Sequence, residues 1–168
     1  MDFDLYGEAT SAAMSTISDS PLTIDIDLNW SLMEMIKAVR DSISEKPETF
    51  PITLYFVSGK TGNENIVPFI DYLLTLKNSL QFVFRGYIHA DFVKLFVSYP
   101  NTQVLISKDS MFIYDTNNVH SIMKHLIPKQ ELFRKFLTRF VEQYHKYDSP
   151  FYLDITELET LGFNIQKF

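Results

Sequence analysis

The chain has 168 residues, of which 46% are hydrophobic and 15% aromatic, enough apolar material for one sizeable core. It contains no cysteine, which excludes a disulfide framework, a thiolate metal site and a cysteine nucleophile. The formal net charge of −6 argues against nonspecific binding to nucleic acid, because that affinity depends on Lys and Arg neutralising phosphates.

The N-terminal stretch carries acidic residues where a signal peptide would carry positive charge, and no hydrophobic run approaches the length that spans a bilayer. We therefore expect a cytoplasmic protein that binds neither membrane nor nucleic acid. Residues 1–20 mix Ser, Thr, Ala and Asp without periodicity, which predicts a flexible N-terminal tail. Residues 21–168 are expected to form a single domain.

The predicted domain opens with a strand. Residues 22–28 alternate apolar and polar side chains, the pattern of a strand with one buried face. Asp25 and Asp27 then share the other face, where a solvated surface is favoured over an acid/base pair or a metal site. Ser31 and Glu34 form a capping box in front of an apolar stripe, which predicts a helix.

Two units with the same order of elements follow. Each has an apolar strand, a short loop and a segment with helical spacing: Ile52–Val57, Ser58–Asn63 and Ile66–Leu76 in the first, and Leu80–Arg85, Gly86–Ala90 and Asp91–Val97 in the second. Two such units side by side indicate a parallel sheet covered by helices, because parallel strands need crossover connections.

A long helix is predicted to begin at Pro128, since proline is favoured at the first helical position. Its large apolar residues recur at helical spacing: Leu132, Phe133, Phe136, Leu137, Phe140, Val141 and Tyr144. They cover an arc of roughly 180°, wider than a helix on a single core usually needs. We therefore expect these residues to form a subunit interface as well as part of the core.

The last stretch has clear start and stop signals. Asp154 and Glu157 form a second capping box, Ile155–Leu161 is predicted as a helix, and Gly162 ends it. Phe163–Lys167 is predicted as the final strand.

The order and spacing of four stretches resemble the proteolytic subunit of the Clp protease, within the wider Clp/crotonase fold: LYFVSGKTGNENIVPFIDYLL, VFRGYIHADFVKLF, SKDSMFIYDT and YLDITELETLGFNI. The resemblance covers roughly Leu22 to the C-terminus. It implies an α/β fold of repeated ββα units, with a mainly parallel sheet flanked by helices. It also implies a handle helix, shortened here because the interval from Tyr114 to Lys146 is shorter than in the family.

The resemblance places the family's catalytic triad on unsuitable side chains. The serine falls on Ala90, which offers no lone pair for nucleophilic attack. The histidine falls on Tyr114, a phenol whose reference pKa of about 10 does not suit a near-neutral base. The aspartate falls on Lys146, with Asp148 nearby. The family's glycine-rich oxyanion loop falls on residues 59–61, Gly-Lys-Thr, so the expected protein is catalytically inactive.

The resulting hypothesis is an oligomeric scaffold or binding protein without cofactor or metal. Its expected partner is a protein: further copies of itself, or a Clp-like subunit in a hetero-oligomer. One alternative is a crotonase-like or hydrolytic enzyme with a rebuilt site around His89, Asp91 and Tyr114, with Asp115 close by. Another is a non-catalytic ring subunit mixed with an active homologue. For His89 and Asp91, capping the short helix or lying at the surface is favoured.

Overall fold

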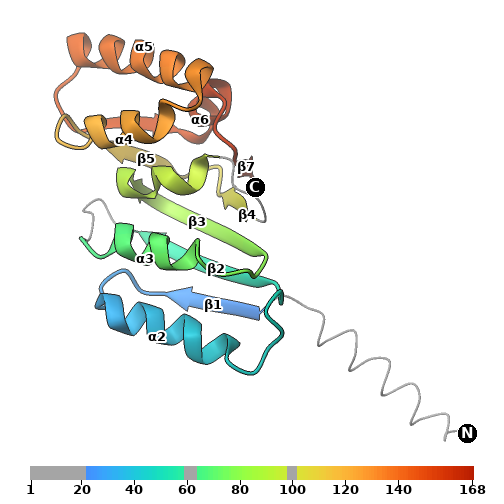
Figure 1. Ribbon diagram of the computed structural model, residues 1–168. Helices are drawn as coiled ribbons and strands as arrows, with labels where there is room; N and C mark the ends of the chain where they lie inside the picture. Colours follow the sequence, from blue (N-terminus) through green and yellow to red (C-terminus); the bar gives the residue numbers. More distant parts are fainter. Residues whose placement is uncertain (1–21, 59–63, 98–101) are drawn as a thin grey trace, which may run out of the picture.

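The computed structural model of the chain describes residues 22–58, 64–97 and 102–168 (Figure 1). The predicted tail at 1–20 and the predicted oxyanion loop at 59–61 lie outside these residues. Within the described ranges, no helix is long and apolar enough to cross a membrane.

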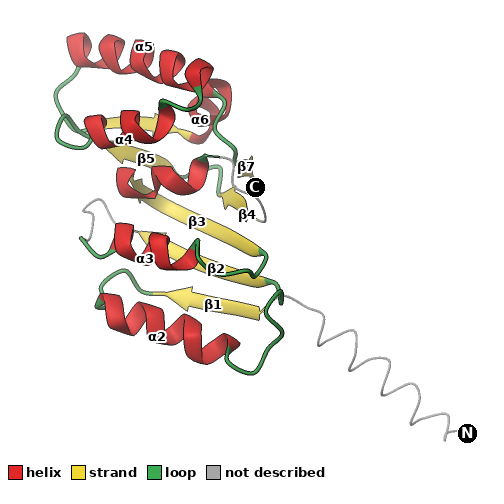
Figure 2. Ribbon diagram, viewed as in Figure 1, coloured by secondary structure: helices red, strands yellow, loops and turns green. Residues whose placement is uncertain are grey.

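Strands and helices alternate along most of the chain (Figure 2). The elements are β1 (Leu22–Ile26), α2 (Leu32–Ile43), β2 (Ile52–Ser58), α3 (Ile66–Leu73), β3 (Leu80–His89), the 3₁₀ helix η1 (Ala90–Phe96), β4 (Thr102–Ile106), β5 (Met111–Tyr114), α4 (Val119–Leu126), α5 (Gln130–Lys146), β6 (Phe151–Asp154), α6 (Ile155–Leu161) and β7 (Gln166–Lys167). In the described part, only β4, β5 and α4 follow one another in ββα order.

Five strands form a wholly parallel sheet in the order β1-β2-β3-β4-β7. The register aligns Ile24, Leu54, Phe82 and Val104 across it, and all four side chains are buried. The helices α2, α3 and η1 lie over this face (Figure 1). The predicted α/β fold with a mainly parallel sheet flanked by helices is thus confirmed.

Strand β3 also carries a second, smaller sheet. Its pairing with β4 ends at Phe84, and its parallel pairing with β5 begins at Tyr87. Between them, Gly86 has a φ of 80°, a conformation that glycine adopts without a Cβ penalty and that lets the strand turn. β5 in turn pairs with β6 in antiparallel fashion.

The interpretation of Gly86–Ala90 as a loop is therefore wrong. The strand continues through His89, because the glycine redirects it from one sheet to the other. Ring contacts link the two sheets through the core: Phe56 to Phe84 at 5.1 Å, Phe84 to Phe96 at 6.0 Å and Phe96 to Phe112 at 5.6 Å between centroids.

Local signals predicted several elements correctly. Both capping boxes are present, with Ser31 and Asp154 at the N-caps of α2 and α6. Gly162 ends α6 in the left-handed conformation, with a φ of 103°. In β1, Ile24 and Ile26 are buried whereas Asp25 is exposed, which confirms the solvated face.

Other boundaries also differ from the prediction. The helix predicted at Ile66–Leu76 ends at Leu73. Pro128 does not open α5; it follows the unpredicted helix α4, whose C-cap is Ile127, and prolines are common just after a C-cap. The final strand is only Gln166–Lys167, because Phe163 packs into the core and Asn164 donates its backbone N–H to the Phe96 carbonyl.

A substitution at Ala90 tests whether the β3–η1 junction is buried. Its side chain is only 2% exposed, so Ala90→Asp would bury an unpaired carboxylate and should lower the free energy of unfolding by about 3 kcal/mol or more. Urea denaturation measures this loss. The matched control is Ala38→Asp on α2, where the side chain is partly exposed and the loss should be much smaller. Equal losses would contradict the buried junction.

Candidate functional site

The end of β3 holds the residues that the sequence marked as a rebuilt site. His89 is the N-cap of η1, and its Nδ1 accepts the backbone N–H of Asp91 at 3.2 Å. The same Nδ1 lies 3.3 Å from Asp91 Oδ2. The two side chains are 18% and 27% exposed. The favoured interpretation is confirmed for His89, whose imidazole caps the short helix by accepting a first-turn donor; Asp91 supplies that donor from its backbone.

Ala90 opens η1 between those two polar residues, but its methyl group points into the core. It is 2% exposed, and the next residues along the helix, Phe92 and Val93, are also buried. A side chain in this place neither reaches solvent nor offers a nucleophilic atom.

Tyr114 ends β5 and is completely buried. Its ring contacts those of Phe136 and Phe151, at centroid distances of 5.3 Å and 5.4 Å. Its hydroxyl donates a hydrogen bond to Gln143 Oε1 on α5. Burial raises the pKa of Tyr114 well above its usual value, with the Arg139 charge opposing and the Glu157 charge adding to the shift. The phenol therefore keeps its proton near neutral pH and does not act as a base there.

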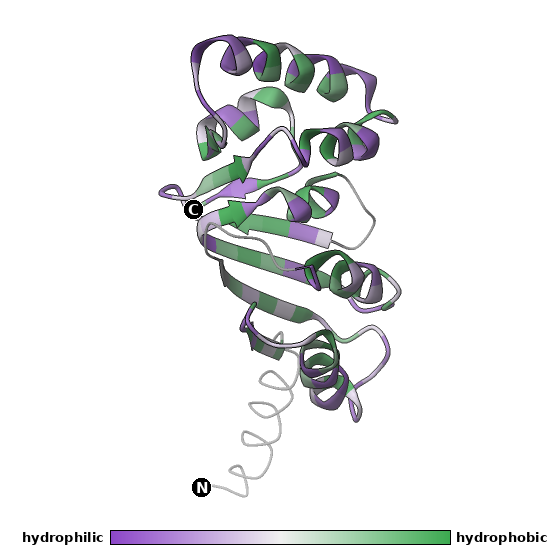
Figure 3. Cartoon of the chain, turned by 90° about the vertical axis from the view of Figure 1, so that its left-hand side faces the viewer, coloured by the Kyte–Doolittle hydropathy of each residue, from purple (hydrophilic) through white to green (hydrophobic). Residues whose placement is uncertain are grey.

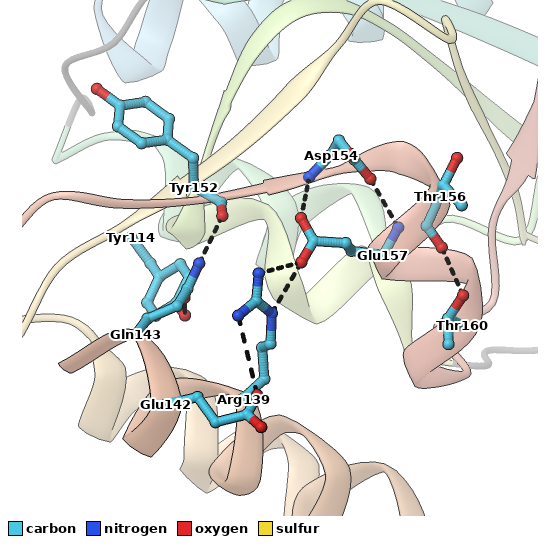
Figure 4. A network of polar contacts seen from close by, with 9 residues as sticks. All are labelled: Tyr114, Arg139, Glu142, Gln143, Tyr152, Asp154, Thr156, Glu157 and Thr160. Carbon is cyan, nitrogen blue, oxygen red and sulfur yellow. Dashed lines mark hydrogen bonds and ion pairs between the residues drawn. The ribbon is translucent and has the colours of Figure 1, made fainter. Parts of the chain in front are cut away.

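A polar network extends from this tyrosine to the neighbouring elements (Figure 4). Gln143 Nε2 donates to the Tyr152 carbonyl on β6 at 2.8 Å. Arg139 Nε donates to Glu157 Oε2 at 2.8 Å, and the guanidinium adds a second bond through Nη2. Together these bonds tie α5 to β5, β6 and the start of α6, in an arrangement that holds secondary structure rather than a reacting group.

Sequence reasoning missed Gln143, which is only 4% exposed. A signal was present, because Gln143 follows Phe136 and Phe140 by seven and three residues and so continues the apolar stripe of α5. A polar residue on a buried stripe needs hydrogen-bond partners, and Gln143 uses both ends of its amide.

The remaining predicted positions are Lys146, Asp148 and Asp115. Lys146 is the last residue of α5 and is exposed. Asp148 lines a cavity of about 480 Å³ together with Arg139, Gln143 and Tyr147. Asp115 Oδ1 accepts the backbone N–H groups of residues 117 and 118, at 2.8 Å and 3.1 Å, in the turn before α4. One oxygen of its carboxylate thus accepts two turn bonds.

Among the described residues, no three His, Cys, Asp or Glu side chains gather as a group that could hold a metal ion. The pair His89–Asp91 is the part of the proposed rebuilt site that the fold brings together. Tyr114 is held instead by the aromatic core and Gln143.

The predicted interface residues of α5 fall into two sets. Leu132 and Phe136 are buried, and Phe133 and Phe140 are partly buried against the core. The other three are exposed: Leu137 at 40%, Val141 at 44% and Tyr144 at 57%. We call Leu137, Val141 and Tyr144 the α5 stripe; they lie three and four residues apart and so share one face of the helix.

The Tyr114–Gln143 bond has a testable contribution to stability. Tyr114→Phe keeps the ring but leaves Gln143 Oε1 buried without its donor, which should lower the free energy of unfolding by about 1–3 kcal/mol. Urea denaturation gives the value. Tyr144→Phe, on an exposed side chain of the same helix, is the control and should change stability by no more than about 0.5 kcal/mol. The role assigned to the network fails if the two variants behave alike.

Neither protein families nor curated proteins provide a relative for this chain. No family model matches this chain. No curated protein matches it either.

Solved structures do share the fold. A structure described only as an enzyme superimposes with a TM-score of 0.58 at 13% identity, over 87% of this chain and 94% of the other. A ClpP1 mutant from Listeria monocytogenes gives 0.50 at 13% identity, covering 94% and 95%. A peptidase from Plasmodium falciparum gives 0.50 at 12% identity, covering 94% and 98%. Likeness at this level of identity concerns the fold alone, and the chain has a Clp-like fold.

Proposed function

We propose that this protein is a catalytically inactive Clp-like subunit that acts as an oligomeric scaffold or binding protein. The observation that carries the proposal is the side chain at the end of β3. The resemblance to the Clp protease implies that the family's nucleophile falls at this place, which here holds the buried methyl group of Ala90. Acyl transfer through a covalent intermediate requires an activated oxygen, sulfur or nitrogen at that point.

The state of Tyr114 supports the same proposal. The same resemblance implies that the family's general base, which must exchange a proton near neutral pH, falls at this place. Tyr114 is instead buried, hydrogen-bonded to Gln143 and shifted to a higher pKa by burial. Restoring a serine alone would therefore restore only one member of the triad.

The assembly part of the proposal rests on the α5 stripe. An apolar row on an otherwise charged helix is costly to leave in water and is typical of contact surfaces. A scaffold needs such a surface, whether it binds further copies of this chain or a Clp-like subunit in a mixed ring.

A fluorophosphonate probe tests the loss of hydrolase chemistry. The wild-type protein should remain unlabelled, because Ala90 has no hydroxyl, and Ala90→Ser should also remain unlabelled because Tyr114 cannot activate the new serine. Labelling is measured by intact mass, with an active Clp protease as the positive control. Stoichiometric labelling of the wild type would disprove inactivity.

Sedimentation tests the assembly surface. Val141→Arg places a charge in the middle of the α5 stripe. The variant should have a lower native mass than the wild-type protein, and its circular dichroism spectrum should be unchanged. Glu142→Arg is the matched control, since Glu142 is exposed on the same helix but is not three or four residues from any member of the stripe. Leu132→Arg should unfold the protein, because Leu132 is buried.

A monomeric wild type at high micromolar concentration would contradict self-assembly. In that case, native mass measurement after pull-down from the source distinguishes a mixed ring from a protein without Clp-like partners.

A second candidate function keeps the pair His89–Asp91 as an acid/base site, since Nδ1 and Oδ2 lie 3.3 Å apart and both side chains reach solvent. It requires a measurable turnover of peptide or thioester substrates that His89→Ala and Asp91→Ala together abolish. Turnover that survives both substitutions would exclude this pair as the site.

A further inference from the structure

One face of the parallel sheet has no helix over it in the part of the chain that the structure describes. The helices α2, α3 and η1 lie on the opposite side, as the rotated view shows (Figure 3). The strand residues that point to the uncovered face alternate with the core residues and are mostly polar. Polar side chains from several strands therefore lie next to one another on this face.

A row of side-chain hydrogen bonds crosses the uncovered face. Thr53 Oγ1 donates to Gln81 Oε1 at 3.2 Å, Gln81 Nε2 to Gln103 Oε1 at 2.8 Å, and Gln103 Nε2 to Gln166 Oε1 at 3.0 Å. We call these four residues the amide ladder. A primary amide has two N–H donors and an oxygen with two lone pairs, and the ladder uses one donor and one lone pair of Gln81 and of Gln103. Each of these two amides can therefore still donate one hydrogen bond and accept one from a ligand.

A cavity of about 340 Å³ opens beside the ladder, at the N-terminal ends of β2, β3 and β4. Its lining combines the apolar Ile52 and Leu80, both buried, with Thr53, Gln81 and Gln103 from the ladder. None of the described residues that line it carries a charge. A cavity of this volume, with apolar surface and convergent polar groups, is of the size that takes a small ligand.

The chemistry of the lining restricts what that ligand can be. Among the described lining residues, an anion would find no Lys or Arg and a cation would find no carboxylate. An extended peptide would find no free backbone edge, because β2 pairs with both β1 and β3, and β3 pairs with both β2 and β4. A hydroxyl group both donates and accepts, so a ligand with neighbouring hydroxyls matches the donor and the acceptor that each amide still offers.

We propose that this cavity binds a neutral polyhydroxylated ligand, a sugar, whose hydroxyls bond to the amides of Gln81 and Gln103. Tyr55 lies two residues beyond Thr53 on the same face, and its side chain is 37% exposed. Its ring offers an apolar surface to the C–H groups of a sugar that extends beyond the cavity. The inference goes beyond the proposed function and is independent of it, because the cavity lies at the start of β3 whereas His89 lies at the end of that strand.

Two-dimensional nitrogen–proton NMR of the full-length protein tests the site. The probes are D-glucose, D-galactose, D-mannose and diacetylchitobiose, each titrated to high millimolar concentration, with triglycine as the peptide probe. At least one sugar should give saturable shifts in the backbone signals of the cavity residues and in the side-chain amide signals of Gln81 and Gln103. Triglycine should give none.

Gln103→Leu supplies the second arm. It removes the amide from the lining, and because Gln103 is exposed the fold should be kept, which circular dichroism checks. The variant should bind the sugar at least about tenfold more weakly, since two hydrogen bonds to the ligand are lost. Gln130→Leu is the matched control, an exposed glutamine on α5 outside both the ladder and the cavity, and should bind as the wild type does.

Three results would overturn the inference. The first is that no sugar of the four gives saturable shifts at the cavity. The second is that Gln103→Leu binds as tightly as the wild type. The third is that triglycine saturates the site, which would assign the cavity to a peptide.

Discussion

Strand β3 is the constraint on which the rest of the structure depends, because it is the strand shared by both sheets. Its first half pairs with β2 and β4, and its last three residues pair with β5. The turn at Gly86 sets the angle between the two sheets. The phenylalanines that fill the space between the sheets, among them Phe84 and Phe96, contact one another only because that angle is fixed.

The end of β3 also determines which side chains are available for chemistry at the candidate site. Where β3 ends, the chain passes at once into η1, and the backbone of this junction fixes which side chains face the core. Ala90 faces the core, and the His89 side chain caps the helix by accepting the backbone N–H of Asp91. Across the core, Tyr114 and Gln143 use their polar atoms to attach α5. Ala90, Tyr114 and Gln143 are therefore engaged in holding the fold.

Features that depend on only a few neighbouring residues could be predicted from the sequence. Capping boxes, the alternation in β1 and the stop at Gly162 depend only on contacts within one turn or strand. The continuation of β3 beyond Gly86 could not be predicted, because a glycine with positive φ marks a loop as often as a bend in a strand. The exposed edge of α5 and the partners of Gln143 depend on β6, which is distant in sequence, so local patterns carry no information about them.

The order of strands in the sheet also has a consequence for folding. β4 obtains its outer partner from Gln166–Lys167, and the bond from Lys108 N–H to the Phe168 carbonyl closes the same edge. During synthesis on the ribosome, β4 therefore presents an open edge until residues 166–168 emerge. Open parallel edges pair readily with other chains, and nonlocal pairing is slow. Nascent chains of this protein thus depend on β7 for protection of this edge against aggregation.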